Sequence, residues 1–277
     1  MNHPASHTRS RVTIVEENGS RTRLDYLTTE EPLEIRLVEP KKTLAVTMRT
    51  PGADFDLVAG FLYGEGVIES RDQLVGMRYC VDLADGQQRE NIINVSLGEE
   101  TSRFLPSLER HFFTNSACGV CGKASLETIR VRNRVRRDDD RKVRAETLYS
   151  LGDKLRSAQG LFKITGGLHA AALFDMDGNL LRSREDVGRH NALDKLIGAS
   201  FLAGELPLEG GIVMVSGRSS FEILQKCIVA GVPIVCSVSA PSSLAVTLAR
   251  EFGVTSIGFL RGKKFNLYSG AERVIAS

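Results

Sequence analysis

A regular alternation of apolar runs and amphipathic segments near the end of the chain constrains the fold more than any other feature. The expected order is strand, helix, strand, helix and strand, over residues 212–215, 221–229, 234–238, 242–252 and 256–259. A single helix between consecutive strands returns the chain to the same edge of a sheet, so the strands run parallel with right-handed crossovers. These residues therefore predict an open α/β sheet.

A hairpin and a helix are expected just before these strands. Residues 170–175 and 180–183 flank the sequence Met-Asp-Gly-Asn, which is typical of a tight hairpin turn. Residues 191–202 have helical spacing, with Leu193, Leu196 and Ile197 on one face. We expect one domain over residues 151–277.

The first part of the chain predicts a smaller α+β unit over residues 21–113. Alternating patterns predict strands between residues 33 and 48 and a strand pair at 77–83 and 91–97, and residues 54–62 have helical spacing. We expect residues 1–20 to be a disordered lead-in. Residues 114–150 are expected to form a thiol loop and a connector, whose charged stretch at 130–144 is either solvated or a docking surface for an acidic partner.

Three loops that follow the predicted parallel strands are rich in serine, in cations or in both. They span residues 216–222, 237–243 and 259–264 and carry Arg218, Arg261, Lys263 and Lys264. Ligands bind beyond the carboxyl ends of such strands, and two of the loops open helices whose free amides attract anions. Taken together, the loops predict a site for a phosphate-bearing ligand, although helix caps and surface cations would explain any one loop alone.

Two histidines lie close to these loops in the sequence. His190 follows Asp186 and Arg189, and it could orient a ligand or a thiol, although a lone histidine is more often structural. His169 leads into a predicted buried strand, where we expect a packed, hydrogen-bonded side chain.

Cys118 and Cys121 are separated by two residues and followed by Lys123, whose positive charge favours a thiolate. A closed zinc site needs about four ligands, so Cys80 and a histidine such as His111 would have to complete it. A zinc deaminase places H-x-E before its P-C-x-x-C motif, whereas this thiol pair precedes the hairpin. A thioredoxin-like pair would directly follow a strand of a βαβ unit. A relay of sulfur from a reactive thiolate fits the pattern better, without a metal.

Composition narrows the cellular setting. The net charge of +2 and arginines without interleaved aromatic residues argue against a nucleic-acid partner. No apolar run approaches the roughly 18–20 residues of a membrane span, and the N-terminus has no apolar signal core. The chain has five cysteines, an odd number that is unusual in a secreted protein held together by disulfides. We expect a cytoplasmic protein that does not bind membranes.

Five segments together resemble the FdhD/NarQ family of formate dehydrogenase accessory sulfurtransferases. They are residues 114–123, 166–171, 185–195, 215–222 and 239–246. The resemblance covers about residues 30–270 and implies a cytidine-deaminase-like three-layer α/β/α core without zinc. It also implies a cytoplasmic homodimer that takes sulfur from a cysteine desulfurase and delivers it to the molybdenum cofactor, bis-molybdopterin guanine dinucleotide, for the catalytic subunit of a formate dehydrogenase.

The resemblance also implies roles for individual residues. Cys118 matches the cysteine that carries the persulfide, and Cys121 is either a relay, a resolving thiol or dispensable. Residues 259–264 match a cofactor-binding segment. With the serine-rich loop and His190, the expected cofactor-binding residues are Ser216, Gly217, Arg218, Ser219, His190, Phe259, Leu260, Arg261, Gly262, Lys263 and Lys264.

Two other functions remain open. One is a redox- or zinc-responsive nucleotide-binding protein, and the other is a structural scaffold that presents a dehydrogenase subunit.

Overall fold

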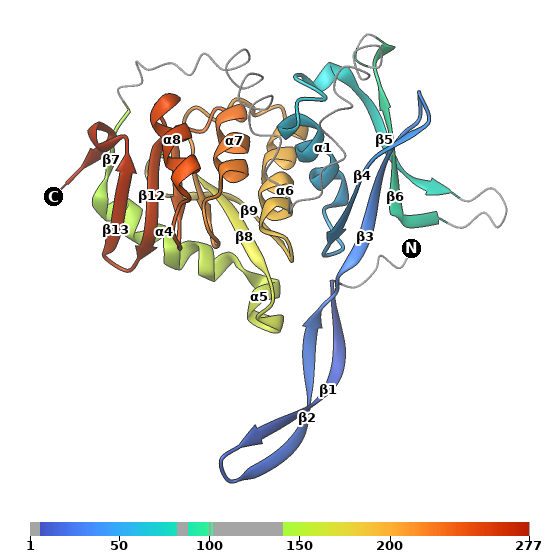
Figure 1. Cartoon of the computed structure of the whole chain (residues 1–277), viewed down its shortest axis with the longest axis horizontal. Coiled ribbons are helices and arrows are strands. Elements are labelled where there is room, and N and C mark those ends of the chain that lie inside the picture. The colour runs from blue at the N-terminus through green and yellow to red at the C-terminus, as the bar shows by residue number, and fades with distance from the viewer. Residues whose placement is uncertain (1–5, 82–87, 100, 102–140, 277) are drawn as a thin grey trace.

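The computed structural model describes residues 6–81, 88–99, 101 and 141–276 (Figure 1). Cys118, Cys121 and most of the charged stretch lie outside the described residues, so the expectations for them stay predictions.

The core of the molecule is a six-stranded sheet in the order β13-β12-β11-β10-β8-β9. Its strands are β8 (His169–Phe174), β9 (Leu180–Asp186), β10 (Ile212–Val215), β11 (Ile234–Ser237), β12 (Thr255–Arg261) and β13 (Lys264–Ser269). β10, β11 and β12 are parallel, while the β8–β9 hairpin and β13 pair antiparallel to their neighbours. The predicted hairpin and the parallel strands are confirmed.

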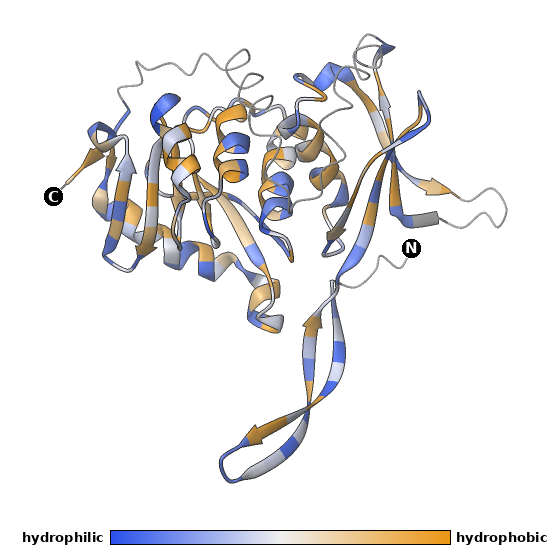
Figure 2. Ribbon diagram, viewed as in Figure 1, coloured by the Kyte–Doolittle hydropathy of each residue, from blue (hydrophilic) through white to orange (hydrophobic). Residues whose placement is uncertain are grey.

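Helices cover both faces of this sheet, as the ribbon shows (Figure 1). They are α6 (Arg189–Leu202), α7 (Phe221–Val229) and α8 (Ser243–Glu251) on one face and α4 (Ala145–Ala158) on the other. Alternation along β10 explains the layers, because Val213 and Val215 pack under α6 and α7 while Ile212 and Met214 pack against α4. Apolar residues accordingly line both inner surfaces (Figure 2). The three-layer α/β/α class is confirmed.

α4 and β13 were not predicted from the sequence. Leu148, Leu151 and Leu155 form the buried stripe of α4. The helix begins at Ala145, so the expected boundary at residue 150 falls inside it and residues 145–150 belong to the core domain. Shorter elements complete this part: α5 (Gly160–Thr165), a 3₁₀ turn at Ala271–Arg273, and β7 (Val143–Arg144) paired with β14 (Val274–Ile275).

The smaller α+β unit is a four-stranded sheet covered by one helix. The order is β4-β3-β6-β5, with β3 (Glu31–Leu37), β4 (Lys42–Arg49), β5 (Leu74–Val81) and β6 (Gln88–Leu97), and a 3₁₀ turn at Arg71–Gln73. α1 (Asp54–Gly64) places Leu57, Val58 and Leu62 against Leu33 and Ile35. The helix and the strands predicted here are confirmed.

α1 and α6 pack closely and join the two units (Figure 1). Gly60 of α1 faces Gly198 of α6, and a Cβ atom on either glycine would overlap backbone atoms of the other helix. A buried ion pair continues the contact, because Lys226 Nζ of α7 lies 2.9 Å from Asp194 Oδ1 of α6 and 3.0 Å from Glu65 Oε1 at the end of α1. The two units therefore share one continuous interior.

Residues 6–28 form a projecting arm rather than a disordered lead-in (Figure 1). β1 (His7–Glu16) and β2 (Gly19–Thr28) pair antiparallel over ten residues each. The strands are joined by the two-residue turn Glu17-Asn18, and Gly19, the first residue of β2, has a φ of +138° that favours glycine. The prediction of disorder over residues 6–20 was wrong because this turn signal and the alternation beside it were overlooked.

Candidate functional site

The three serine- and cation-bearing segments meet at one edge of the core sheet. Ser219 N donates to Ala240 O at 3.3 Å, and Ser242 N donates to Ser219 O at 2.9 Å. Phe259 N donates to Ser239 O at 3.1 Å, which attaches the third segment to the second. Backbone hydrogen bonds thus join loops that are distant in sequence into one surface.

The serines of this surface have different roles. Ser242 Oγ accepts from Ala245 N and caps α8, and Ser216 Oγ accepts from Ala170 N in β8. These two hydroxyls are used by the fold. Ser219 is 1% exposed, and its Oγ has no hydrogen-bond partner among the described residues. A buried hydroxyl without a partner is uncommon, and this one lies in the loop that precedes α7.

The segment at residues 259–264 differs from a simple loop. β12 continues to Arg261, Gly262 and Lys263 form a tight turn, and β13 begins at Lys264. Leu260 is 1% exposed and belongs to the core beside α4, so its side chain is not available to a ligand. Only the backbone of Leu260 can face a ligand, and its place among the cofactor-binding residues stays a prediction.

Phe259 is the unusual residue of that segment. Its φ is +53°, it lies within an irregularity of the β12–β13 ladder, and its side chain is 41% exposed. A left-handed backbone is strained for an aromatic residue and is concentrated at functional positions. The strain turns a flat apolar ring outward beside Arg261, whose Nε donates to Val238 O at 3.2 Å. This ring offers a stacking surface for a planar base.

His190 lies in a pair at the amino-terminal end of α6. Its Nε2 is 2.7 Å from Glu222 Oε2 of α7 and 3.3 Å from Ser220 Oγ. The hydrogen bond from His190 holds the pKa of Glu222 below its usual range, against the opposing effect of partial burial. His190 thus bridges the starts of α6 and α7.

His169 is a site residue that the sequence analysis did not select. It begins β8, and a Cβ atom on Gly217 would lie 3.4 Å from its Nδ1 and 3.7 Å from Arg189 Cδ. Burial and then the positive charge of Arg189 lower the pKa of His169, which keeps the ring neutral near pH 7. Its ring has no hydrogen bond to any described residue that the structure shows, so the expected hydrogen-bonded packing is not found. The preceding pair of glycines was the available signal.

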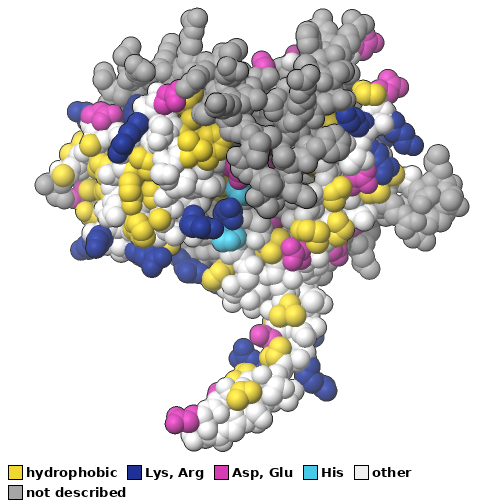
Figure 3. Space-filling view, viewed as in Figure 1, with side chains coloured by type: hydrophobic (Ala, Val, Ile, Leu, Met, Phe, Trp, Pro, Cys, Tyr) yellow, Lys and Arg dark blue, Asp and Glu magenta, His cyan; other side chains and the backbone are white. Residues whose placement is uncertain are grey.

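Histidine and cationic side chains gather on the face drawn in Figure 3. Arg218, Arg261, Lys263 and Lys264 are exposed, whereas Arg189 is half-buried and its Nε has no partner among the described residues. The exposed cations are donors suited to phosphate oxygens, whereas Ser219 Oγ and Arg189 Nε are buried beneath this surface.

The starts of α6 and α7 carry Arg189-His190 and Ser220-Phe221-Glu222. Within the described part of the chain, no group of three His, Cys, Asp or Glu side chains is close enough together to hold a metal ion. The described donors favour an anion over a cation at this edge.

The described cysteines differ in exposure. Cys227 and Cys236 are fully buried, and burial raises the pKa of both thiols, so they stay protonated and are poor nucleophiles. Cys80 is half-buried on β5. Among the described residues, the thiols thus provide no candidate for sulfur chemistry at the site.

Asp186 and Lys195 are structural. Lys195 Nζ lies 2.7 Å from Asp186 Oδ2 and donates to Thr50 O at 2.8 Å, and Asp186 accepts from Thr50 N at 3.1 Å. All three are buried. The pair therefore fastens α6 to the end of β4 and keeps the start of α6 in position.

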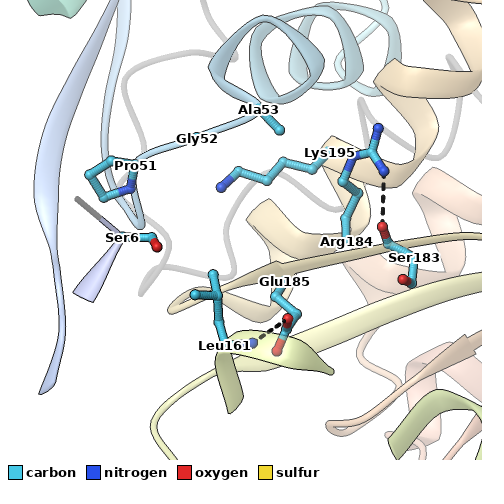
Figure 4. Close-up of a pocket in the computed structure, with 9 residues that line it drawn as sticks. All are labelled: Ser6, Pro51, Gly52, Ala53, Leu161, Ser183, Arg184, Glu185 and Lys195. Carbon is cyan, nitrogen blue, oxygen red and sulfur yellow. Dashed lines mark hydrogen bonds between the residues drawn. The ribbon is translucent and has the colours of Figure 1, made fainter. Parts of the chain in front are cut away.

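A pocket of about 320 Å3 lies beside this pair, as the close-up shows (Figure 4). It is lined by Ser6, Pro51, Gly52, Ala53, Leu161, Ser183, Arg184, Glu185 and Lys195. Its charged groups are occupied by the fold: Glu185 accepts from Leu161 N and Phe162 N, and Arg184 pairs with Asp56. None of its lining residues belongs to the predicted ligand site.

Comparison with known proteins identifies the family. Residues 28–275 match the FdhD/NarQ family. The chain belongs to this family. A protein of Streptomyces avermitilis named "Sulfur carrier protein FdhD" is 50% identical over 269 residues, which cover 96% of this chain and 95% of that one. A protein of Sulfurisphaera tokodaii with the same name is 47% identical over 91% of this chain and 92% of its own.

A solved structure supports the fold. The crystal structure of a putative formate dehydrogenase accessory protein from Desulfotalea psychrophila superposes with a TM-score of 0.76, covering 98% of this chain and 100% of that chain at 23% identity. In addition, no helix among the described residues is long and apolar enough to cross a membrane.

Four of the five segments that carried the resemblance to this family lie in the described residues, and they meet at one sheet edge. Gly166–Gly167 precede His169, Asp186 holds α6, and Ser219 hydrogen bonds to Ala240. The described segments that carried the resemblance therefore supply much of the candidate ligand surface.

Proposed function

We propose that this protein is a sulfur carrier that accepts persulfide sulfur from a cysteine desulfurase and transfers it to the molybdenum cofactor, bis-molybdopterin guanine dinucleotide, for formate dehydrogenase maturation. Its relatives of 45–50% identity are named sulfur carrier proteins. The observation that carries the proposal is the surface that joins three loops of cations and serines to the outward-facing Phe259.

The residues of this surface fit the proposed cargo. A guanine dinucleotide has a planar base and a pyrophosphate, which need a stacking surface and anion-binding donors. Phe259 would stack on the base, while the exposed cations Arg218 and Arg261 would hold phosphate oxygens. Gly217 lies next to His169 and Arg189, because a Cβ atom on it would be in ordinary van der Waals contact with both side chains.

The sulfur step is assigned to Cys118. Its thiolate attacks the outer sulfur of a donor persulfide, which forms Cys118–S–SH and releases the thiolate of the donor. Cys121 offers a route for release: its thiolate attacks the inner sulfur of Cys118, a disulfide forms, and hydrosulfide leaves. Both steps conserve atoms and charge, and the second oxidises the two cysteines while it reduces the carried sulfur.

The assembly belongs to the same proposal. We expect a cytoplasmic homodimer that meets the desulfurase and the catalytic subunit of the dehydrogenase in turn. The buried thiols of Cys227 and Cys236 stay outside this pathway because they are protonated and inaccessible.

The direct test is mass spectrometry of the intact protein after anaerobic incubation with a cysteine desulfurase and cysteine. We expect a gain of about 32 Da, one sulfur atom, located on Cys118 by peptide mapping. Cys118→Ala should lose the adduct, and Cys227→Ala is the control that should keep it. If wild-type protein gains no mass, the proposal fails; stoichiometric zinc that disappears with Cys121→Ser would favour a zinc-responsive protein instead.

A further inference from the structure

The arm of β1 and β2 has few contacts with the rest of the described chain. Thr29 N donates to Ser6 O at 3.0 Å, which continues the pairing of the two strands at the base of the arm, and Thr28 Oγ1 donates to Thr165 Oγ1 of α5 at 2.9 Å. Beyond the base the ribbon extends away from the body (Figure 1). A two-stranded ribbon is only marginally stable in water by itself, so a ladder of ten pairs indicates a surface that another molecule covers.

The register of the ribbon separates its side chains onto two faces. One, which we call the basic face, contains His7, Arg9, Arg11, Thr13, Val15, Ser20, Thr22, Leu24, Tyr26 and Thr28. The other, the paired face, contains Thr8, Ser10, Val12, Ile14, Glu16, Gly19, Arg21, Arg23, Asp25 and Leu27. Ring contacts agree with this division, because His7 packs edge-on against Tyr26 and Arg9 lies over the same ring.

Charge differs between the two faces. On the paired face, Arg21 forms an ion pair with Glu16 at 3.0 Å, and Arg23 lies 3.6 Å from Asp25. Both of its arginines are thus balanced by acids of the same face. The basic face has two arginines and no acidic residue. Its positive charge is therefore available to another molecule.

Exposed apolar side chains accompany these arginines. Val15 is 79% exposed and Leu24 is 63% exposed, and Leu24 lies directly opposite Arg11 in the ladder. An alternation of cations and apolar residues along a free ribbon matches an extended segment that alternates acidic and apolar residues. Nucleic acid fits less well, since the basic face has one tyrosine and no other aromatic residue besides His7.

We propose that the basic face of the arm is a docking surface for an acidic, extended segment of a partner protein. Arg9 and Arg11 pair with its carboxylates, and Val15, Leu24 and Tyr26 contact its apolar side chains. A second copy of this chain is a poorer occupant of the same face, because two basic faces repel each other. This proposal goes beyond the sulfur-carrier function and does not depend on it.

The base of the arm lies close to the candidate ligand surface, so a partner docked on the arm would be held near that surface. Thr28, at the base of the arm, lies very close to Gly167: a Cβ atom built on Gly167 would be 2.9 Å from Thr28 Oγ1. Gly167 is two residues before His169 at the candidate ligand surface. A partner held along the arm would therefore be anchored beside the segment that leads into that surface.

The test compares two charge reversals of equal size on the full chain. The double variant R9E/R11E changes the basic face, and R21E/R23E changes the paired face. Binding of a fluorescent synthetic peptide that alternates Glu and Val is measured by anisotropy, with a peptide that alternates Lys and Val as the control. We expect wild-type protein to bind the acidic peptide, R9E/R11E to bind it at least about tenfold more weakly, and R21E/R23E to lose no more than about threefold.

Several results would overturn the proposal. They are failure of wild-type protein to bind the acidic peptide, equal losses in the two double variants, and equal binding of the two peptides. Binding of single-stranded oligonucleotides or phosphatidylserine vesicles that matches peptide binding and is lost in R9E/R11E would show a general affinity for polyanions. A changed sedimentation coefficient in R9E/R11E would show that a second copy covers this face. Circular dichroism confirms that both variants remain folded.

Discussion

The contact between Gly60 and Gly198 makes a stability prediction whose sign is opposite to the usual rule. Alanine in place of a helix-interior glycine normally stabilises a helix by about 1 kcal/mol. In Gly198→Ala the new Cβ atom would overlap Asp56 O and lie 2.5 Å from Gly60 N. Both obstacles are backbone atoms of α1, so no side-chain rotation relieves the overlap.

The size of the effect follows from that distance. Non-bonded carbon and nitrogen atoms need about 3.5 Å, so α1 and α6 must separate by roughly 1 Å or more. Overpacking of this kind costs about 1–3 kcal/mol, and separation also loosens the apolar layer that Leu57 and Phe201 share. Because both obstacles are backbone atoms, the cost should lie in the upper part of that range, at about 2–3 kcal/mol. Subtracting the gain of about 1 kcal/mol in helix propensity leaves an expected net loss of about 1–2 kcal/mol in the free energy of unfolding.

Gly152→Ala is the matched control. It lies inside α4, and its Cβ atom would be 3.7 Å from Met214 Cε and 3.9 Å from Leu260 O, which are ordinary contacts. This variant should gain about 0.5–1 kcal/mol. Urea unfolding followed by circular dichroism gives both values, provided that the slope of each transition stays constant. A Gly198→Ala protein as stable as wild type would refute the close packing of α1 and α6.

Three further predictions concern charges and the ligand surface. Glu222→Gln should lower the free energy of unfolding at neutral pH, because the hydrogen bond from His190 stabilises the carboxylate and lowers its pKa. A lowered pKa gives stability above the ordinary pKa of Glu, so the difference should vanish as pH falls through the acid range, and a constant difference would contradict this hydrogen bond to the carboxylate. Phe259→Ala should weaken guanosine diphosphate binding about 5- to 150-fold in calorimetry, by loss of stacking, and unchanged affinity would remove the ring from the site. Lys226→Met should cost about 3–5 kcal/mol in urea unfolding because it leaves the carboxylate of Asp194 buried and unpaired, and adding Asp194→Asn should recover part of that loss if the reasoning holds.

The pattern of apolar residues predicted the strand and helix layers of the core sheet well, because burial in those layers determines which positions are apolar. The strand at Ile212–Val215 is buried along its whole length between two helical layers, which is why its sequence is continuously apolar. α4 was missed because its stripe of leucines adjoins a charge-dense stretch, and the stripe occupies only one face of a polar helix. Because the preceding residues are so rich in charge, the core domain was expected to begin only after residue 150, which lies inside α4.

The site was predictable in part. Loops that follow parallel strands must lie at one edge, so Arg218 and Arg261 were expected on the same surface. The sequence could not show that Leu260 faces the core or that Phe259 has a left-handed backbone, because both depend on the irregular pairing of β12 with β13. His169 was not predicted as a site residue because it lies beside Gly217 only in the folded chain, and the two residues are 48 positions apart in the sequence.

Transfer of labelled sulfur tests the central claim most directly. Protein loaded with [35S]persulfide is mixed anaerobically with bis-molybdopterin guanine dinucleotide, and the label on the protein and on the cofactor is followed by chromatography. Wild-type protein should pass the label to the cofactor, whereas R218E/R261E should load Cys118 normally and transfer much more slowly. Equal transfer by both proteins, or label that never leaves wild-type protein, would contradict the account.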